Sequence, residues 1–420
     1  MTKEDFNEGL LGFLDASPTP FHATKNMAMM FENAGFTRIF ETQKWDLKAG
    51  EKYYVTRSDS SIIAFTYPED RGKYLMMGTH NDFPTMKIKP NPAVKEGGVV
   101  KLGVESYGSA LLNTWFDRPL SIAGKISYRT KGGNISESIV DAKTALCTIP
   151  SLAIHLNKDA NKCNEINKQT DLYPVISDDE SFEFDEFLHE TLKQNGVSDA
   201  EEIYAHDLSL YSVEKASFFG YKKEFISSGK IDNLLSCYCA MLTLCSAKSS
   251  DAVLFVANNH EEVGSQSTGG ADGSFLRDVL RRMFGDYEEY MMMIRSSMMV
   301  SIDNAHAVHP NFTSKHDANH LPYINKGVVV KINANQRYAT SSTTTAKFMD
   351  TSYRVGESVQ SFVSRGDMPC GSTIGPITAS KLGIDTIDVG VPTYAMHSIN
   401  EVCGSDDAYS LFKILIELCK

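Results

Sequence analysis

The segment AVLFVANNHEEVG, residues 252–264, joins a strand-like run to a set of ionisable side chains. Its opening residues, AVLFVAN, have the apolar and β-branched composition of a buried strand. His260, Glu261 and Glu262 follow at the point where that strand ends. Ligand sites in open α/β sheets form at the carboxyl ends of strands. The segment therefore predicts a buried sheet with a polar site at one edge.

Strands and helices alternate on either side of this segment. We predict further strands at KYLMMGTH (73–80), MMVSID (298–303), GVVVKINAN (327–335) and DTIDVGVP (385–392). Helices are predicted at NLLSCYCAMLTLC (233–245) and SFLRDVLRRMF (274–284). This alternation is typical of an α/β fold, in which a central mixed sheet is flanked by helices.

Between about Pro90 and Phe225 the alternation stops. Short strands punctuated by glycine and serine, such as LSIAGKISYRT (120–130), are followed by an acidic stretch. We therefore predict an inserted β-rich domain at 90–225, and a discontinuous α/β domain made of 1–89 and 226–420, which carries the polar site. The chain of 420 residues is longer than one hydrophobic core usually supports, which also favours two domains.

The composition excludes several classes of protein. The net charge of −12 argues against nucleic acid or an anionic membrane as a partner, because both require a basic surface. The N-terminus lacks the basic start and apolar core of a signal peptide, and no apolar run approaches the length of a membrane span. The cysteines are scattered without C-x-x-C pairs, which favours free thiols and a cytoplasmic location.

Other predicted strands also end in acids or imidazoles. The candidate residues are His80 and Asp82 after YLMMGT, Asp303 and His306 after MMVSI, His397 after the TIDVGVP strand, and Asp232 at the start of the helix after the insert. Repetition of this pattern at several element ends favours one shared site.

Each of these residues also has an ordinary structural explanation. Asp232 stands where a helix N-cap belongs, and Asp303 could bond its own backbone in a turn. Glu261 and Glu262 could be solvated acids favoured by a helix dipole. A lone histidine such as His80 is more often a satisfied core or surface residue. Spacing alone leaves both interpretations open.

Charge balance favours a pair of metal ions. Two divalent cations bring four positive charges, against which Asp232, Glu262 and Asp303 supply three negative charges while His80 and His397 are neutral ligands. One carboxylate must bridge the ions to hold them roughly 3.5–4 Å apart. Oxygen and imidazole ligands without thiolate suit zinc, cobalt or manganese better than a structural zinc cage.

Two acids remain outside this ligand set. Glu261 is adjacent to Glu262, points elsewhere, and is a natural general base beside a metal-activated water. Asp82 lies two residues after His80, where it could orient that imidazole by a hydrogen bond without touching the metal.

The motifs together resemble the M18 aspartyl aminopeptidases. The resemblance is carried, in order, by HNDFP (80–84), PSLAIHLNKDANK (150–162), GKIDNL (229–234), NNHEEVGSQS (258–267), SIDNAHAVHPN (301–311), KHDANHLP (315–322), KINANQRYAT (331–340) and MHSINE (396–401). It covers most of the chain. Several ordered motifs are far more specific than a single short pattern.

The resemblance implies a complete ligand set. One metal ion would be held by His80, Asp232 and Asp303. Asp232 would also bridge to a second ion held by Glu262 and His397, with the remaining glutamate of the pair as proton shuttle. The sequence departs from the family where Asn259 replaces a frequent aspartate, which could alter the surroundings of the metals.

The resemblance also implies an assembly. The insert would be a dimerisation domain, and the subunits would form a tetrahedral dodecamer in which His155 reaches a neighbour's active site to stabilise the oxyanion. From the residues alone, His155 lies in an apolar run and would be a core residue.

The same resemblance assigns substrate contacts. Lys331 and Tyr338 would surround the acidic side chain of the substrate, although Lys331 could instead be a solvated strand lysine. His306 and His316 would line the pocket or support it. Arg337 is another candidate cation with no defined direction.

We therefore predict a two-metal aminopeptidase that releases N-terminal aspartate, then glutamate, from peptides, with Glu261 as general base. Two alternatives remain. One is a broad or neutral-residue aminopeptidase, or a deacylase, on the same fold. The other is a non-catalytic assembly scaffold, against which the intact ligands and base argue.

Overall fold

The computed structural model describes residues 1–162 and 165–420 of the chain. The described chain divides into two compact units. The first comprises 1–82, 216–396 and 401–420, and the second comprises 83–215 and 397–400. The sequence places these boundaries instead at 89/90 and 225/226. The structural division falls earlier because β5 begins at Thr85 and pairs within the second unit, where Ser209 of β10 lies opposite Lys87.

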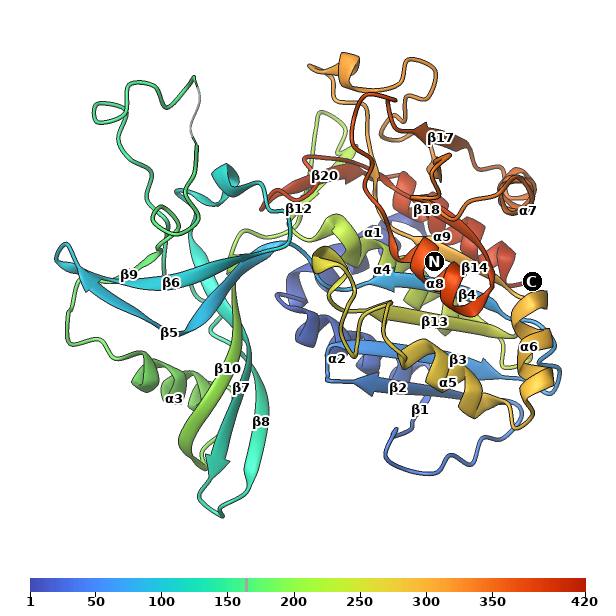
Figure 1. The fold of residues 1–420 in the computed structure, drawn as a ribbon, viewed down its shortest axis with the longest axis horizontal. Coiled ribbons are helices and arrows are strands. Elements are labelled where there is room, and N and C mark those ends of the chain that lie inside the picture. The colour runs from blue at the N-terminus through green and yellow to red at the C-terminus, as the bar shows by residue number, and fades with distance from the viewer. Residues whose placement is uncertain (163–164) are drawn as a thin grey trace. The chain divides into compact units, whose positions relative to one another are not determined.

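The first unit is built on a mixed sheet, which we call the central sheet (Figure 1). Its strands in spatial order are β1 (Thr37–Arg38), β2 (Glu51–Arg57), β3 (Ser61–Tyr67), β13 (Val253–Asn258), β4 (Leu75–His80), β14 (Met298–Ile302), β18 (Asp385–Gly390), β16 (Val328–Ile332) and β17 (Val359–Val363). The run from β13 through β4 and β14 to β18 is parallel. All of β13 is buried, as its apolar composition predicts.

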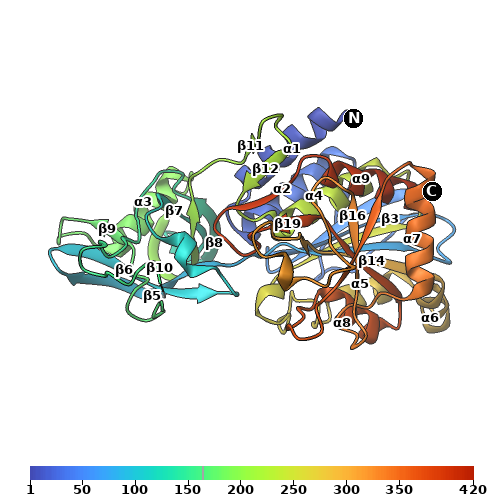
Figure 2. The same ribbon diagram turned by 90° about the horizontal axis from the view of Figure 1, so that it is seen from above.

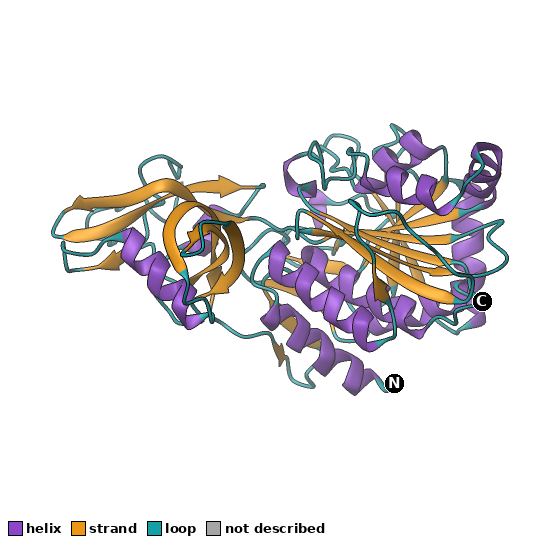
Figure 3. Ribbon diagram, turned by 90° about the horizontal axis from the view of Figure 1, so that it is seen from below, coloured by secondary structure: helices purple, strands orange, loops and turns teal. Residues whose placement is uncertain are grey.

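Helices cover both faces of the central sheet (Figure 3). They are α1 (Lys3–Ala16), α2 (Pro20–Asn33), α4 (Ile231–Ser246), α5 (Phe275–Met283), α6 (Tyr287–Ser296), α7 (Ser342–Arg354), α8 (Ile374–Leu382) and α9 (Asp407–Leu418). Helix α4 is buried from Ile231 to Leu244 because it packs against β4, β13, α1, α2 and α9. The predicted α/β fold with flanking helices is confirmed.

A small sheet lies beside the start of α4 in the first unit. Its strands in order are β11 (Ser217–Phe219), β12 (Phe225–Ser228), β20 (Glu401–Gly404), β19 (Pro392–Tyr394) and β15 (Ala305–His306). Strand β12 leads directly into α4, so this sheet fixes where that helix begins. The 3-10 turns η2 (Glu261–Val263) and η3 (Thr313–Lys315) also belong to this unit.

The second unit is an antiparallel β-sheet with one helix packed on it (Figure 2). Its elements are β8 (Ile135–Asp141), β7 (Leu120–Thr130), β10 (Ala200–Ser212), β5 (Thr85–Glu96), β6 (Val99–Tyr107), β9 (Val175–Ser177), η1 (Leu112–Trp115) and α3 (Phe184–Gln194). Leu188 and Leu192 of α3 share a core with Ile126 and Val140. At Gly124 a side chain would meet the carbonyl oxygen of Asp207 at 2.0 Å, so only glycine fits.

The described cysteines are all free thiols, as the sequence predicts. They are Cys147, Cys237, Cys239, Cys245, Cys370, Cys403 and Cys419, and Cys163 lies outside the described residues. Among the helices that the structure describes, none combines the length and hydrophobicity of a membrane span.

Candidate metal centre

The carboxyl ends of three adjacent parallel strands meet at one edge of the central sheet (Figure 1). In the register of β13 and β4, Asn258 lies opposite His80, and in that of β4 and β14, Gly78 lies opposite Ser301. Asp303 therefore follows its strand at the level where His80 ends its own. Parallel pairing explains why these strand ends collect their polar side chains in one place.

His80 is the centre of this group. Its side chain is 2% exposed, and its Nδ1 donates a hydrogen bond to the carbonyl oxygen of Asp82 at 3.0 Å. Its Nε2 lies 3.4 Å from Asp232 Oδ1 and 3.5 Å from Asp303 Oδ1. Tetrahedral ligands with bonds of about 2.0–2.1 Å lie about 3.4 Å apart, so these three atoms fit a shared cation.

Two groups of donor atoms share this imidazole. One ligand atom each from His80, Asp232 and Asp303 lie within 4.8 Å of one another, and the same holds for His80, Glu261 and Glu262. The donors are imidazole nitrogen and carboxylate oxygen, which suit zinc and similar divalent cations. Residues far apart in the sequence are thus brought together as a potential metal centre.

The charges in this group are strongly coupled. Burial lowers the pKa of His80, but its hydrogen bonds with Asp232, Asp303 and Asp82 raise that pKa well above 6.5. Burial opposes ionisation of Asp303, yet the Lys331 ammonium and the His80 imidazole hold the pKa of this carboxyl below its usual range. Neighbouring carboxylates thus favour the protonated form of His80, as a nearby negative charge does for any imidazole.

The turn that carries Glu261 and Glu262 is held by Asp82. The Asp82 carboxylate accepts hydrogen bonds from the amide of Glu261 at 3.0 Å and from that of Glu262 at 3.1 Å. Asp82 itself is 0% exposed. Its backbone carbonyl orients His80, while its carboxylate anchors the two glutamates, which is a wider role than the sequence predicts.

The two glutamates are half-buried in the first turn of η2. Burial, followed by the effect of nearby carboxylates, raises the pKa of Glu261 to about 8 against the opposing effect of His80. Burial and then Asp232 raise the pKa of Glu262 well above 4.5. Their place in the first turn of η2 agrees with the alternative of first-turn acids, and the raised pKa values agree with a site shared with other carboxylates. Asn259 is buried next to them, and its Oδ1 accepts from the His260 amide at 2.9 Å.

Asp232 lies at an irregular start of α4. The N-cap position is taken by Lys230, whose φ is +66°, so the N-cap alternative for Asp232 is wrong. Asp232 has non-helical backbone angles, and its amide donates to Glu401 Oε2 at 2.9 Å. Asn233 follows and donates from its side chain to the carbonyl of Ile302 at 2.8 Å. This irregular turn is anchored to both β20 and β14.

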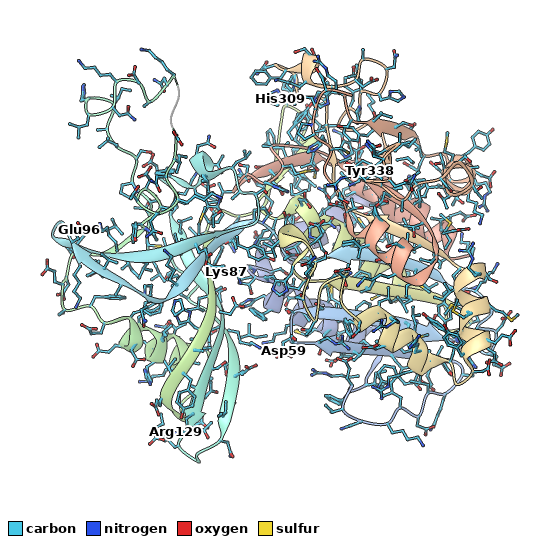
Figure 4. The ribbon with its side chains drawn as sticks, in the orientation of Figure 1. Asp59, Lys87, Glu96, Arg129, His309 and Tyr338 are labelled. Carbon is cyan, nitrogen blue, oxygen red and sulfur yellow. The ribbon has the colours of Figure 1, made fainter. Side chains whose placement is uncertain are left out.

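Lys331 is buried beside the same centre. Its ammonium lies 3.3 Å from Asp303 Oδ2 and donates to the carbonyl of Asn304 at 2.9 Å. The side chain is 3% exposed, so the alternative of a solvated strand lysine is wrong. The ring of Tyr338, on the segment between β16 and α7 (Figure 4), has its centroid 5.4 Å from Lys331 Nζ.

The remaining predicted histidines differ in their hydrogen-bond partners and neighbours. His306 is exposed on β15, with its ring 5.9 Å from that of Phe362. His316 Nε2 accepts from the amide of His309 at 3.2 Å, which supports the loop rather than a ligand set. His397 belongs to the second unit, where its Nδ1 donates to the carbonyl of Ser109 at 3.1 Å.

His155 differs from the expectation based on its residues alone. The apolar run around it predicts a core position, yet His155 is exposed in the second unit, as are Leu152, Ile154 and Leu156. The run is therefore an exposed apolar loop, and the core interpretation is wrong.

Two buried acids near the centre were missed by sequence reasoning. Glu401 is 1% exposed and bonds the Asp232 amide. Asp388 is 0% exposed on β18, where it accepts from Thr373 Oγ1 and from the Ala339 amide, each at 2.6 Å. Asp388 stands between Ile387 and Val389 in the middle of a predicted strand, which is a signal that could have drawn attention to it.

This geometry can be compared with known proteins. Residues 13–417 match the family model described as Aminopeptidase I zinc metalloprotease (M18). The chain belongs to the M18 peptidase family. This M18 peptidase is 46% identical, over 419 residues, to the probable M18 family aminopeptidase 2 of Pseudomonas fluorescens (strain SBW25), covering 98% of this chain and 97% of the relative.

Solved structures of M18 peptidases share the fold. The cryo-EM structure of the Ape4 and Nbr1 complex matches this M18 peptidase with a TM-score of 0.95 and 34% identity, over 99% of this chain and 86% of the other. The structure of the S. cerevesiae mApe1 dodecamer matches with a TM-score of 0.87 and 27% identity, over 99% and 96%. The chain is therefore a metallo-aminopeptidase of the M18 family, which binds divalent metal.

Proposed function

We propose that this M18 peptidase binds two divalent metal ions and releases acidic residues, aspartate before glutamate, from peptide N-termini. The observation that carries the proposal is the convergence of His80, Asp232 and Asp303 beside Glu261, with the buried cation Lys331 in contact with the same group. The donors supply the metal sites, the glutamate a base, and the lysine a positive charge for an acidic substrate.

The ligands divide between two sites. His80, Asp232 and Asp303 would hold one ion, and Asp232, Glu262 and His397 would hold the second, with Asp232 common to both sites. Chain connectivity supports His397, because Glu401, only four residues later, bonds the Asp232 amide at 2.9 Å. Four residues reach at most about 14 Å when extended. The Nδ1 hydrogen bond of His397 to Ser109 leaves Nε2 as its ligand atom.

Zinc is the expected ion, with cobalt or manganese able to replace it. When bound, two such ions lower the pKa of a coordinated water toward about 7 and polarise the peptide carbonyl. The protein provides a dry, preorganised setting for both effects through buried His80 and Asp82. Asp82 fixes the turn of Glu261 and Glu262, so base and ligand keep a constant relative position.

Glu261 moves the proton in this proposal. Its carboxylate takes a proton from the attacking water as the new carbon–oxygen bond forms. It then gives that proton to the departing nitrogen as the carbon–nitrogen bond breaks, so the amine leaves neutral. Burial raises the pKa of Glu261 in the metal-free protein, and bound cations would lower that pKa and favour the carboxylate that the first step requires.

Lys331 provides the preference for acidic residues. An ammonium has three donors, and Lys331 directs two of them to Asp303 and the carbonyl of Asn304. The third can pair with the substrate carboxylate, with Tyr338 and His306 forming other parts of the pocket. A buried charge discriminates strongly, because a neutral substrate leaves that donor unpaired.

The active assembly is a homo-oligomer. The related S. cerevesiae mApe1 structure is a dodecamer, and we extend that assembly to this chain. The exposed apolar side chains of Leu152, Ile154 and Leu156, which flank His155, support contact with a second copy. His155 would stabilise the oxyanion in the neighbour's active site.

The test is hydrolysis of peptides beginning with Asp, Glu, Leu or Lys by chelator-treated protein, with Zn²⁺, Co²⁺ or Mn²⁺ added back. We expect cleavage only after metal addition, fastest for Asp and then Glu. Restored cleavage that favours Leu would overturn the acidic preference and retain the metal-dependent reaction. Binding of metal without cleavage of any of the four peptides would contradict the proposed activity.

A further inference from the structure

Glu401 is a buried acid in contact with the backbone of a proposed metal ligand. It is the first residue of β20, is 1% exposed, and accepts a hydrogen bond at Oε2 from the amide of Asp232 at 2.9 Å. Burying a carboxylate is costly unless strong partners compensate it. The position therefore requires an explanation beyond packing.

The small sheet sets the position of Glu401. In the antiparallel pair of β12 and β20, Ser228 lies opposite Glu401. The chain continues from Ser228 through Lys230, which has a φ of +66°, to Asp232 with its non-helical angles. Glu401 is therefore attached to the 228–232 segment at two points. Its backbone pairs with Ser228 in the β12–β20 sheet, and its carboxylate accepts a hydrogen bond from the Asp232 amide. These two attachments fix the turn that presents the Asp232 carboxylate.

A neutral side chain in place of Glu401 could satisfy the Asp232 amide, so the stability of the turn does not require a charged group. The first amides of a helix have no partner inside the helix, and a serine or asparagine usually satisfies them. A carboxylate makes a stronger, charge-assisted bond to an amide, and it also brings a negative charge. Lys331 likewise brings a charge, of opposite sign, to Asp303 of the same ligand set. The charges next to the ligand set therefore include one of each sign.

We propose that Glu401 is a positioning residue that holds Asp232 in the orientation needed to bridge two metal ions. This inference rests on the proposed function, in which Asp232 is the bridging ligand. Glu401 touches neither substrate nor metal in this role, and acts through the Asp232 backbone. Groups that orient a ligand in this way change metal affinity by about 10–100-fold when they are removed.

The test compares Glu401→Ala with Glu401→Gln. Glutamine keeps an oxygen that can accept from the Asp232 amide, whereas alanine removes it. We expect the alanine variant to bind the weaker of the two metal ions about 10–100-fold less tightly, in competition with a chromogenic chelator. We also expect its cobalt form to have an altered visible absorption spectrum. The glutamine variant should restore the spectrum and most of the affinity.

Asp407→Ala is the matched control. Asp407 is also a buried acid that bonds backbone amides, those of Asn325 and Gly327, at 2.6 and 2.9 Å. Its loss should lower the melting temperature while the cobalt spectrum and metal affinity remain those of the wild type. If Glu401→Ala behaves in the same way, with lower stability and unchanged metal binding, the inference is overturned.

Two further measurements keep the outcome clear. If the alanine variant does not fold, Glu401→Asp replaces it, because its shorter side chain withdraws the carboxylate from Asp232 while retaining the charge. Weakened metal binding by this folded variant supports the inference, and normal binding overturns it. If the wild-type protein binds two ions but cleaves no acidic peptide, only the proposed specificity is contradicted. If the wild-type protein binds no metal, both the proposed function and the role of Glu401 are contradicted.

Discussion

The ammonium of Lys331 lies 3.3 Å from the Oδ2 oxygen of Asp303, and both side chains are buried. Asp303 presents its other oxygen, Oδ1, to His80 at 3.5 Å. One carboxylate therefore faces a fixed cation on one side and the proposed metal position on the other. Because the lysine draws charge away from Asp303, we expect this carboxylate to be the weaker donor of the proposed ligands.

Replacing Lys331 with methionine should affect both metal binding and specificity. The change leaves Asp303 buried without its cation, which costs about 3–5 kcal/mol of stability in buried ion pairs. Activity should fall on all peptides, and roughly 10–100-fold further on an Asp-terminated peptide than on a Leu-terminated one, because a charge-assisted bond is lost. The ratio of kcat/KM for the two peptides is the measurement. An unchanged ratio would show that Lys331 pairs with Asp303 and does not bind the acidic side chain of the substrate.

Glu261→Gln should separate metal binding from catalysis. The amide cannot accept a proton, so kcat should fall roughly 100- to 10,000-fold. The backbone contact of Glu261 with Asp82 does not involve the side chain and should persist. Metal content measured by mass spectrometry should equal that of the wild type. Full activity in this variant would exclude Glu261 as the base.

Asp82→Ala should disturb both glutamates together. It removes the carboxylate that accepts from the Glu261 and Glu262 amides at 3.0 and 3.1 Å. We expect about 10–100-fold weaker metal binding and a lower kcat, measured by chelator competition and by peptide hydrolysis. Asp82→Asn keeps one acceptor oxygen and should be intermediate. Wild-type affinity in the alanine variant would show that the turn needs no such anchor.

The metal-free protein should lose stability as pH rises. Burial is the main reason why the pKa of Glu261 rises from 4.5 to about 8. The negative charges of Asp303, Asp82 and Asp232 add to this rise, and His80 opposes it. The folded state therefore binds this proton more tightly than the unfolded state. The contribution to stability is present below the unfolded pKa and is lost as pH rises through the folded pKa.

Urea denaturation of chelator-treated protein from about pH 5 to about pH 8 measures this effect. The midpoint of the wild type should fall more steeply with pH than that of Glu261→Gln, which has no proton to lose. Added zinc should reduce the difference, because the cation compensates the carboxylates. Parallel curves for the two proteins would contradict the assignment.

The loop around His155 should govern assembly. Leu156 is 76% exposed, so Leu156→Asp introduces a charge with little effect on the fold of a subunit. We expect smaller particles by analytical ultracentrifugation, because a charge opposes burial at a contact. His155→Ala should retain the assembly and reduce kcat. Full-size particles for Leu156→Asp would place the contact elsewhere.

The sequence by itself determined the central sheet and the residues at its edge. His80 is the last residue of β4, Asp303 directly follows β14, and Glu261 and Glu262 come within four residues of the end of β13. Local composition therefore places them at strand ends. Parallel pairing then brings those ends together. These features follow from short-range pattern, and the structure confirms the α/β fold that the pattern predicts.

Only the tertiary structure decided how these residues are supported. Lys331 reaches Asp303 across 28 positions, Glu401 reaches Asp232 across 169, and Asp82 reaches Glu261 across 179. A buried polar group must find a partner, but periodicity does not say which of many distant groups that partner is. These pairs form because the fold places β16, β20 and the end of β4 next to the partner segments, and that placement depends on the whole fold.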